Sequence, residues 1–317
     1  MTGRIGVLLL NLGGPAGPDE VRPFIRDLLS EPAVLGLPWP LRPALASFIA
    51  SLRFRKVITH YDAIGGASPI GECTAAQAEG VAARLGPGFV VRHAFRFSAP
   101  RIPQIVEALA AQGVRRLVAL PLFPQASRST TGVVLAALEK AVMGRMEIAA
   151  CGSHAGADGY IEALADGILS RLGDAQHVIV SAHGLPAKLA SRDTYLPDVK
   201  RTFAALEKRL AGRAPLSLAF QSRLGRGKWT EPYLTDEIAR LASTGSRRLL
   251  VAPVSFACEN LETLYELDIE LPLLVRSLGA LSIARAPVPG THPAYLAALA
   301  GLVRRALEDA GEARHAV

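Results

Sequence analysis

A pattern that occurs twice in this chain restricts its fold more than any other feature of the sequence. GVRRLVALPL at 113–122 and GSRRLLVAPV at 245–254 share a glycine, two arginines, a leucine and a proline in the same register. The other matches keep the same order along the chain: VLLLNLGGP (7–15) with VIVSAHGLP (178–186), HAFRF (93–97) with LAFQS (218–222), and ALAAQG (108–113) with RLASTG (240–245). Four ordered pairs indicate that the two halves share one structural plan.

Apolar, β-branched runs alternate with segments of helical periodicity in both halves, which is typical of parallel βαβ units. The expected strands lie near 5–12, 89–97, 116–123 and 146–151 in the first half, and near 177–182, 216–222, 248–255 and 280–286 in the second. We therefore predict an α/β protein of two similar Rossmann-like domains, each a small parallel sheet of strand order 2-1-3-4 flanked by helices. Because ligands of such sheets bind beyond the carboxyl ends of the strands, we expect an active-site cleft between the domains.

The predicted domain boundary lies near 152–158, where Gly-Ser-His-Ala-Gly-Ala-Asp reads as a connection. We expect an N-terminal domain over 1–152 and a C-terminal domain over 153–292. The last helix, within 293–317, is expected to pack back on the first domain.

The two halves differ most between their first and second strands, where the first half carries the long segment 15–88. Segments this long in compact domains are usually functional or disordered. The part at 34–57, VLGLPWPLRPALASFIASLRFRKV, is apolar and ends in a basic cluster. A core helix is one interpretation. The other is an active-site lip, over about 15–70, that suits a large flat anionic ligand or an anionic membrane surface.

Composition excludes several classes of protein. Half of the 317 residues are hydrophobic, which is ample for a core, and the three cysteines include no CxxC pair, so a disulfide framework or structural zinc site is not expected. The apolar N-terminal run is short and lacks a cleavage site, which favours a first strand over a signal peptide. We expect a cytoplasmic protein. Its net charge of +7 favours anionic partners, but no nucleic-acid-binding motif is present.

The segment PVSFACENLETLYELDIELP at 253–272 concentrates acidic residues in a basic protein. Glu262, Glu266 and Glu270 recur every four residues, so on a helix they would share one face and repel each other. A solvated acidic face at a helix start explains the first carboxylates. The alternative is a track of carboxylates that attracts a divalent cation or carries protons.

His183 ends the first strand of the second half, and Glu262 follows its third strand. Strands one and three are neighbours in the predicted order, so we expect the imidazole and this carboxylate to lie side by side. A lone histidine is usually structural, but this one has a partner that the topology supplies. An imidazole beside a carboxylate suits a borderline divalent metal or proton abstraction.

Together these motifs resemble the ferrochelatases, which are class II chelatases. The resemblance spans nearly the whole chain in order: NLGGP (11–15), YDAIGGASPI (61–70), FRF (95–97), PLFPQASRSTTG (121–132), SAHGLP (181–186), FQSRLG with Trp229 (220–229), and PVSF…ExxETLYELDIE (253–270). It implies that the two domains have the chelatase-type fold. It also implies a lyase that inserts Fe²⁺ into a porphyrin, with release of two protons, in haem biosynthesis.

The resemblance also implies roles for individual residues. His183 and Glu262 would be catalytic and bind the metal, with Glu266 and Glu270 behind them as an acidic track. The residues implied to lie near the porphyrin or its propionates are Leu12, Arg53, Ser68, Arg96, Phe97, Ser222, Trp229 and Phe256. Leu12 resembles the protoporphyrin-using branch, in which tyrosine is not usual at this position.

Some positions depart from the family pattern. Asn260 stands where a second histidine is usual, so Glu259 or Asn260 would be an accessory group, and we expect Asn260→His to be tolerated. Three scattered cysteines argue against the [2Fe–2S] cluster of some relatives, so no resident cofactor is expected. We expect a monomer that binds porphyrin and Fe²⁺, with a basic lip that suits peripheral membrane contact. The alternatives are a coproporphyrin ferrochelatase, another tetrapyrrole chelatase, and a non-enzymatic tetrapyrrole carrier.

Overall fold

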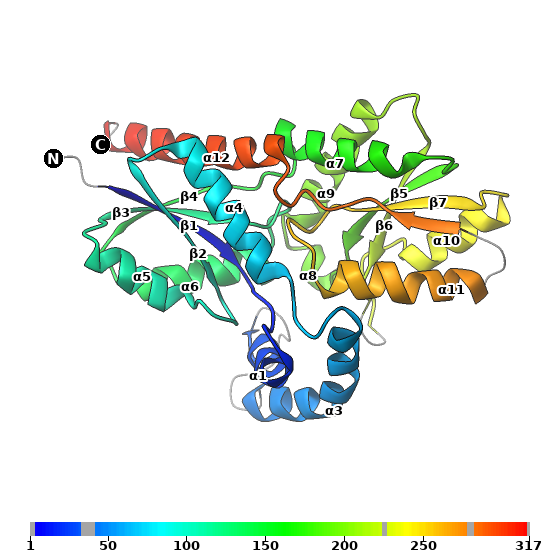
Figure 1. The fold of residues 1–317 in the computed structure, drawn as a ribbon, viewed down its shortest axis with the longest axis horizontal. Helices are drawn as coiled ribbons and strands as arrows, with labels where there is room; N and C mark the ends of the chain where they lie inside the picture. The colour runs from blue at the N-terminus through cyan, green and yellow to red at the C-terminus, as the bar shows by residue number, and fades with distance from the viewer. Residues whose placement is uncertain (1–3, 33–41, 224–226, 278–281, 316–317) are drawn as a thin grey trace. The chain divides into compact units, whose positions relative to one another are not determined.

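The computed structural model describes residues 4–32, 42–223, 227–277 and 282–315 (Figure 1). Within these ranges the strands fall where the sequence predicts them: β1 (Ile5–Asn11), β2 (Phe89–Phe95), β3 (Arg116–Pro121), β4 (Glu147–Ala150), β5 (His177–His183), β6 (Leu216–Gln221), β7 (Arg248–Pro253) and β8 (Ser282–Arg285). They form two sheets in the orders β2-β1-β3-β4 and β6-β5-β7-β8, with every pair parallel. The predicted strand order 2-1-3-4 is confirmed in both halves.

The central strands are apolar because helices cover both faces of a parallel sheet. In β1, IGVLLLN, every residue after Ile5 is buried, and in β5, HVIVSAH, every residue before His183 is buried. Neither strand alternates polar and apolar residues, as a strand with one solvated face would. The helical elements of the described residues are α1 (Pro18–Leu29), α3 (Arg42–Ala63), α4 (Ile70–Leu85), α5 (Ile102–Ala111), η2 (Arg128–Gly132), α6 (Val133–Val142), α7 (Asp158–Leu172), α8 (Ala187–Ala190), α9 (Tyr195–Arg209), α10 (Leu234–Ser243), η3 (Glu262–Glu270), α11 (Leu271–Ser277) and α12 (Pro293–His315).

The chain divides into two compact units, each built on one sheet. The first unit comprises residues 1–122, 128–152 and 299–317, and the second comprises 123–127 and 153–298. The short segment 123–127 therefore belongs with the second sheet although it follows β3. The C-terminal part of α12 belongs to the first unit, where Arg304 donates a hydrogen bond to the carbonyl of Arg84 at the end of α4 (2.6 Å).

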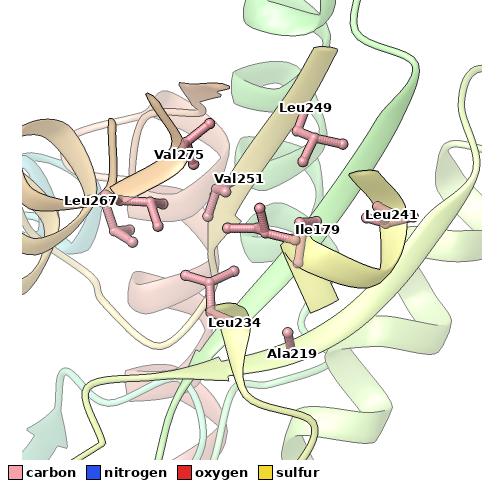
Figure 2. Close-up of a cluster of buried hydrophobic side chains, with 10 residues drawn as sticks. Ile179, Ala219, Leu234, Leu241, Leu249, Val251, Leu267 and Val275 are labelled. Carbon is pink, nitrogen blue, oxygen red and sulfur yellow. The ribbon is translucent and has the colours of Figure 1, made fainter. Parts of the chain in front are cut away.

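The second unit has a core between its sheet and the helices α10, η3 and α11 (Figure 2). Ile179 and Val251 project from the central strands, and Leu234 comes from the start of α10. Leu267 of η3 packs into the same cluster and is only 3% exposed. Burial of a leucine is worth about 2 kcal/mol, so this contact holds η3 against the carboxyl half of the sheet.

The insertion in the first unit folds into α1, α3 and α4, and its residues 33–41, which include the whole of the apolar VLGLPWPL stretch, lie outside the described residues. Helix α3 is not a core helix along its whole length. Leu45, Phe48 and Leu52 are 36%, 60% and 66% exposed, while Ala46 and Ala50 on another face are buried. Among the described residues, no helix has the length and apolar character needed to cross a membrane.

Candidate active site

His183 is the last residue of β5 and is half-exposed, unlike the rest of its strand. Its ring lies edge-on to that of Phe256, with 5.9 Å between ring centroids. The Nδ1 atom is buried and has no hydrogen-bond partner in the described chain. Burial lowers the pKa of His183, and the carboxylate of Glu266 acts in the opposite direction. Burial therefore favours the neutral imidazole at the carboxyl end of the sheet, with no hydrogen-bond partner of Nδ1 in the described chain.

Glu266 is held in place by Ser222, which directly follows β6. The backbone N–H of Ser222 donates to Oε1 of Glu266 at 2.7 Å, and its hydroxyl donates to Oε2 at 2.5 Å. Ser222 has a φ of 65°, a left-handed conformation that costs a non-glycine residue about 1–2 kcal/mol. Such strain is found where the surroundings require it, often at functional sites. Here it directs both donors of one residue at one carboxylate.

Glu262 and Glu266 lie on η3, a π-helix of nine residues. Helices with i→i+5 hydrogen bonds are rare beyond a single turn and occur frequently at functional sites. Burial raises the pKa of both carboxyl groups, and the charge of Glu262 further raises the pKa of Glu266. The sequence placed Glu262 beside His183. The carboxylate whose charge acts on His183 is Glu266, which is in turn close to Glu262.

The other acidic residues of the segment have different environments. Arg285, at the end of β8 and only 12% exposed in its side chain, pairs with Glu259 at 3.0 Å and with Asp268 at 2.8 Å. Glu270 is exposed. Of the predicted acidic track, Glu262 and Glu266 are half-buried and Glu270 is exposed, whereas Glu259 and Asp268, outside the track, pair with Arg285 of β8. Glu259, predicted as an accessory group, is engaged in this ion pair.

Asn260 stabilises the start of the helical segment that begins at Leu261. Its Oδ1 accepts the backbone N–H of Thr263 at 3.0 Å, and its own N–H donates to the Thr263 hydroxyl at 3.0 Å. Both residues are buried. This is the reciprocal arrangement of a capping box, in which side chains satisfy N–H groups that have no partner within the helix.

Trp229 lies beside the residue that follows His183. It pairs with Pro186 in an antiparallel bridge, and Thr230 donates its N–H to the carbonyl of Leu185 at 2.9 Å. Gly184 permits this approach, because a Cβ there would lie 2.6 Å from the carbonyl oxygen of Gln221 and 3.5 Å from the Trp229 ring. The glycine after the histidine is therefore required by packing.

The first unit gathers four of the predicted porphyrin contacts at the carboxyl ends of β1 and β2. Phe97 donates its N–H to the carbonyl of Leu12 at 3.0 Å, which extends the ladder of these strands. The guanidinium of Arg96 lies 5.1 Å from the Phe97 ring centroid and pairs with Glu31 at 3.1 Å, while its Nε is buried without a partner among the described residues. Phe97 itself is buried against Phe24.

Ser68 joins this group through the loop that follows β1. Its N–H donates to the carbonyl of Pro15 at 2.8 Å, and a Cβ on Gly14 would lie within 2.6 Å of its side chain. Arg53 stands apart on α3, where it is half-exposed. The structure therefore brings Leu12, Ser68, Arg96 and Phe97 together and shows no contact that joins Arg53 to them.

Two polar residues beside His183 were missed by the sequence analysis as site residues. The hydroxyls of Tyr195 and Ser255 both bond to the backbone of His183. A signal was present: Tyr195, Asp198 and Thr202 are polar residues on the buried face of α9, and buried polar residues that share a helix face have specific partners. No group of three or more His, Cys, Asp or Glu side chains in the described part of the chain is arranged to hold a metal ion.

The sequence model of the ferrochelatase family matches residues 4–307. The chain belongs to the ferrochelatase family. Ferrochelatases from Gloeothece citriformis and Trichodesmium erythraeum are each 36% identical to it, over 97% and 96% of this chain and 84% and 83% of their own lengths. The resemblance drawn from the motifs is confirmed, and with it the assignment to the metal chelatases among the lyases.

Solved structures that resemble this member of the ferrochelatase family include two chelatases. SirB from Bacillus subtilis with Fe³⁺ has a TM-score of 0.57 and 15% identity, over 96% of this chain and 95% of SirB. CbiX, described as the terminal enzyme for biosynthesis of sirohaem in denitrifying bacteria, has a TM-score of 0.52 and 15% identity, over 95% of this chain and 98% of its own. At these identities the likeness shows the fold, and the predicted chelatase-type fold is confirmed.

Proposed function

We propose that this ferrochelatase-family protein inserts Fe²⁺ into protoporphyrin IX, giving protohaem and two protons. The observation that supports this chemistry best is the imidazole of His183, whose Nδ1 atom is buried without a partner in the described chain and whose pKa is lowered by burial, with the charge of Glu266 acting on it. Metal insertion breaks two pyrrole N–H bonds and forms bonds from the porphyrin nitrogens to iron, with no change of oxidation state. The protein must therefore supply a base, and a base must be unprotonated before the reaction.

His183 is proposed to accept the first pyrrole proton. Its neutral state follows from burial, and the Nδ1 lone pair has no partner in the described chain. Binding energy from the rest of a large flat ligand can offset puckering of the macrocycle, which turns a pyrrole nitrogen out of the plane. The base then meets a nitrogen that is accessible rather than enclosed by the ring.

Glu266 and Glu262 are proposed to carry protons away and to receive the incoming cation. A carboxyl group whose pKa is raised by burial exchanges protons nearer neutral pH than an exposed one. The charge of Fe²⁺ favours the ionised carboxylate, so arrival of the metal and departure of protons are coupled. Fe²⁺ is a substrate in this scheme, and we propose no resident cofactor.

The residues proposed to contact the porphyrin are those named from the family resemblance: Leu12, Arg53, Ser68, Arg96 and Phe97 of the first unit, and Ser222, Trp229 and Phe256 of the second. Two of them have modified roles. Ser222 has both donors on Glu266, so its effect on the porphyrin is indirect. Phe97 is buried, and its ring packs against the guanidinium of Arg96. Leu12 supports protoporphyrin over coproporphyrin as substrate.

An anaerobic metalation assay tests this proposal. Purified protein is incubated with Fe²⁺ and either protoporphyrin or coproporphyrin, and formation of the metalloporphyrin is followed by absorbance. We expect turnover with protoporphyrin, faster than with coproporphyrin, and its loss in His183→Ala with porphyrin binding retained. Failure of the wild type to metalate either substrate, with porphyrin still bound, would favour a tetrapyrrole carrier. Faster turnover of coproporphyrin would favour the coproporphyrin branch.

We also propose that the protein is cytoplasmic, monomeric and attached peripherally to anionic membranes through α3. Leu45, Phe48 and Leu52 are exposed on this helix, and Arg55 and Lys56 are exposed one turn further along. Apolar side chains beside basic ones suit the boundary between headgroups and acyl chains. Sedimentation with vesicles of anionic lipid should fall strongly in Phe48→Ser/Leu52→Ser, whereas neutral vesicles should bind neither protein. Equal sedimentation of both proteins with anionic vesicles would exclude α3 as the attachment site.

A further inference from the structure

The backbone of His183 extends beyond the end of the neighbouring strand. The last residue pair between β5 and β7 is Ser181 with Pro253, and the N–H of Val254 donates to the carbonyl of Ser181 at 2.9 Å. Backbone groups of alternate residues in a strand point to the same side, so those of His183 point where β7 has already ended. The opposite side of β5 is still paired, because Gly184 donates its N–H to Gln221. Two backbone groups at the candidate base therefore need other partners.

The side chains of Ser255 and Tyr195 supply them. The N–H of His183 donates to Oγ of Ser255 at 3.1 Å, the hydroxyl of Tyr195 donates to the carbonyl of His183 at 2.6 Å, and the two hydroxyl oxygens are 2.9 Å apart. One placement of protons satisfies all three contacts, with Ser255 as the donor to Tyr195. The result is a closed ring of hydrogen bonds that all run in one direction. Such chains polarise and strengthen each other.

Tyr195 is a donor in this ring because of its surroundings. It is only 5% exposed, and burial raises the pKa of its hydroxyl, so the proton stays on the oxygen. Its helix is fixed by two further buried contacts of the same face: Asp198 accepts the N–H of Ala126 at 3.1 Å, and Thr202 donates to the carbonyl of Ala155 at 2.8 Å. The hydroxyl of Tyr195 is thus held at a set position relative to the sheet.

The position of Ser255 is also set by buried hydrogen bonds, which are made by the backbone of the preceding residue, Val254. The carbonyl of Val254 accepts hydrogen bonds from Nε2 of Gln125, at 3.0 Å, and from the hydroxyl of Tyr160. Phe256, the residue after Ser255, places its ring edge-on to the imidazole. The segment 254–256 therefore contacts both the backbone of His183, through the Ser255 hydroxyl, and its imidazole, through the Phe256 ring.

We propose that Tyr195 is a positioning residue for the reaction, which acts with Ser255 by fixing the backbone of His183 so that the imidazole meets the substrate. This inference rests on the proposed role of His183 as proton acceptor. The imidazole has no hydrogen bond of its own through Nδ1 within the described chain, so its place is set by its backbone and by packing against Phe256. A base displaced by about 1 Å loses about a hundredfold in rate, whereas binding of a large porphyrin surface changes little.

Tyr195→Phe tests the proposal, because it removes one hydroxyl and retains the aromatic side chain. We expect kcat for metalation to fall by about tenfold or more, with the KM for porphyrin and for Fe²⁺ within about twofold of wild type. The matched control is Tyr295→Phe. That tyrosine is also fully buried and its hydroxyl bonds to His154, at 3.1 Å, rather than to His183, so kcat should not change.

A second readout does not depend on activity. In protein with ¹³C-labelled histidine, the His183 ring signal is identified by its loss in His183→Ala. We expect this signal to shift and broaden in Tyr195→Phe and to stay unchanged in Tyr295→Phe. If wild-type protein does not metalate porphyrin, the proposed function fails, yet this measurement still decides whether Tyr195 positions the imidazole.

Ser255→Ala provides an independent variant in case Tyr195→Phe folds poorly. It removes the other member of the ring, so it should give the same kcat defect and the same change in the His183 signal. Because the ring acts as a unit, the double variant should be no more than about twofold slower than either single variant. An unchanged His183 signal in both variants, or a defect confined to KM for porphyrin, overturns the proposal.

Discussion

Asn260 provides a sharp test of how the candidate carboxylates are held, and Asn260→His is the informative change. On sequence grounds the histidine usual in the family should be tolerated at this position. The structure changes that expectation, since Asn260 accepts the N–H of Thr263 and donates its own N–H to the same residue's hydroxyl, both at 3.0 Å. The Nδ1 atom of an imidazole can take the place of the amide oxygen, but the ring adds two further atoms at a position where Asn260 is only 9% exposed. We therefore expect histidine here to destabilise the protein.

The magnitude follows from the extra volume of the ring. Inserting additional atoms into a packed, buried site typically costs about 1–3 kcal/mol. We therefore expect a loss of about 2 kcal/mol. For a domain of this size, that corresponds to a fall in Tm of about 4–8 °C.

Calorimetry of the wild type, Asn260→His and Asn260→Ser measures this effect. Serine retains a short side-chain oxygen at the same place, so Asn260→Ser should lie within about 1 kcal/mol of the wild type. The metalation rate of Asn260→His should also fall, because η3 carries Glu262 and Glu266. An Asn260→His protein as stable as the wild type would show that the buried site accommodates the ring, and it would restore the expectation drawn from the sequence.

Three further predictions concern other contacts of the second unit. Ser222→Ala and Ser222→Gly both lose the hydroxyl bond to Glu266, worth about 1.5–3 kcal/mol. Only the glycine variant also relieves the left-handed backbone, so denaturant unfolding should show it to be more stable than the alanine variant by about 1 kcal/mol. Equal stability of the two variants would contradict the backbone strain at Ser222. Burial lowers the pKa of His154 to about 3 in the folded protein. As pH falls below about 6.5, the unfolded chain therefore binds a proton that the folded protein does not. About 2 kcal/mol of stability should be lost between pH 7 and pH 5 for this reason. In His154→Gln the loss measured by denaturant titration should be smaller by about 2 kcal/mol, although His183, whose pKa burial also lowers, still contributes. An equal loss in both proteins would assign it to groups other than His154. Gly184→Ala brings a Cβ against the Gln221 carbonyl, so it should destabilise the protein by about 1–3 kcal/mol and lower kcat. No change in stability or in kcat would show that β5 and β6 can separate at this position.

The residue pattern predicted the fold because it repeats and because parallel strands have few arrangements. Each strand found in the described chain coincides with a predicted apolar run, and both sheets have the predicted order. That order places the ends of β5 and β7 side by side, which is why the sequence alone relates His183 to the acidic segment. The motifs were long enough to indicate the family, and the comparison with known ferrochelatases confirms it.

The contacts within the site could not be predicted in the same way. Spacing alone made one acidic track of Glu262, Glu266 and Glu270, because a regular α-helix was assumed for the segment. The structure forms a π-helix instead, and Arg285 of the following strand, 17 residues after Asp268, pairs with both Asp268 and Glu259. An ion pair between a helix and a strand depends on where each one is placed in three dimensions, and the spacing of acidic residues within one segment holds no information about that.

By itself, the sequence determined the duplicated α/β plan, the family and the position of His183 at a strand end, since these follow from periodicity and from local motifs. The tertiary structure alone decided how His183 is held, which carboxylate acts on it and what Asn260 does. The physical reason is the same in each case. Hydrogen bonds and burial act over a few ångströms, so they are set by packing between segments such as α9, η3 and the end of β7, whose distance along the chain says little about their distance in space.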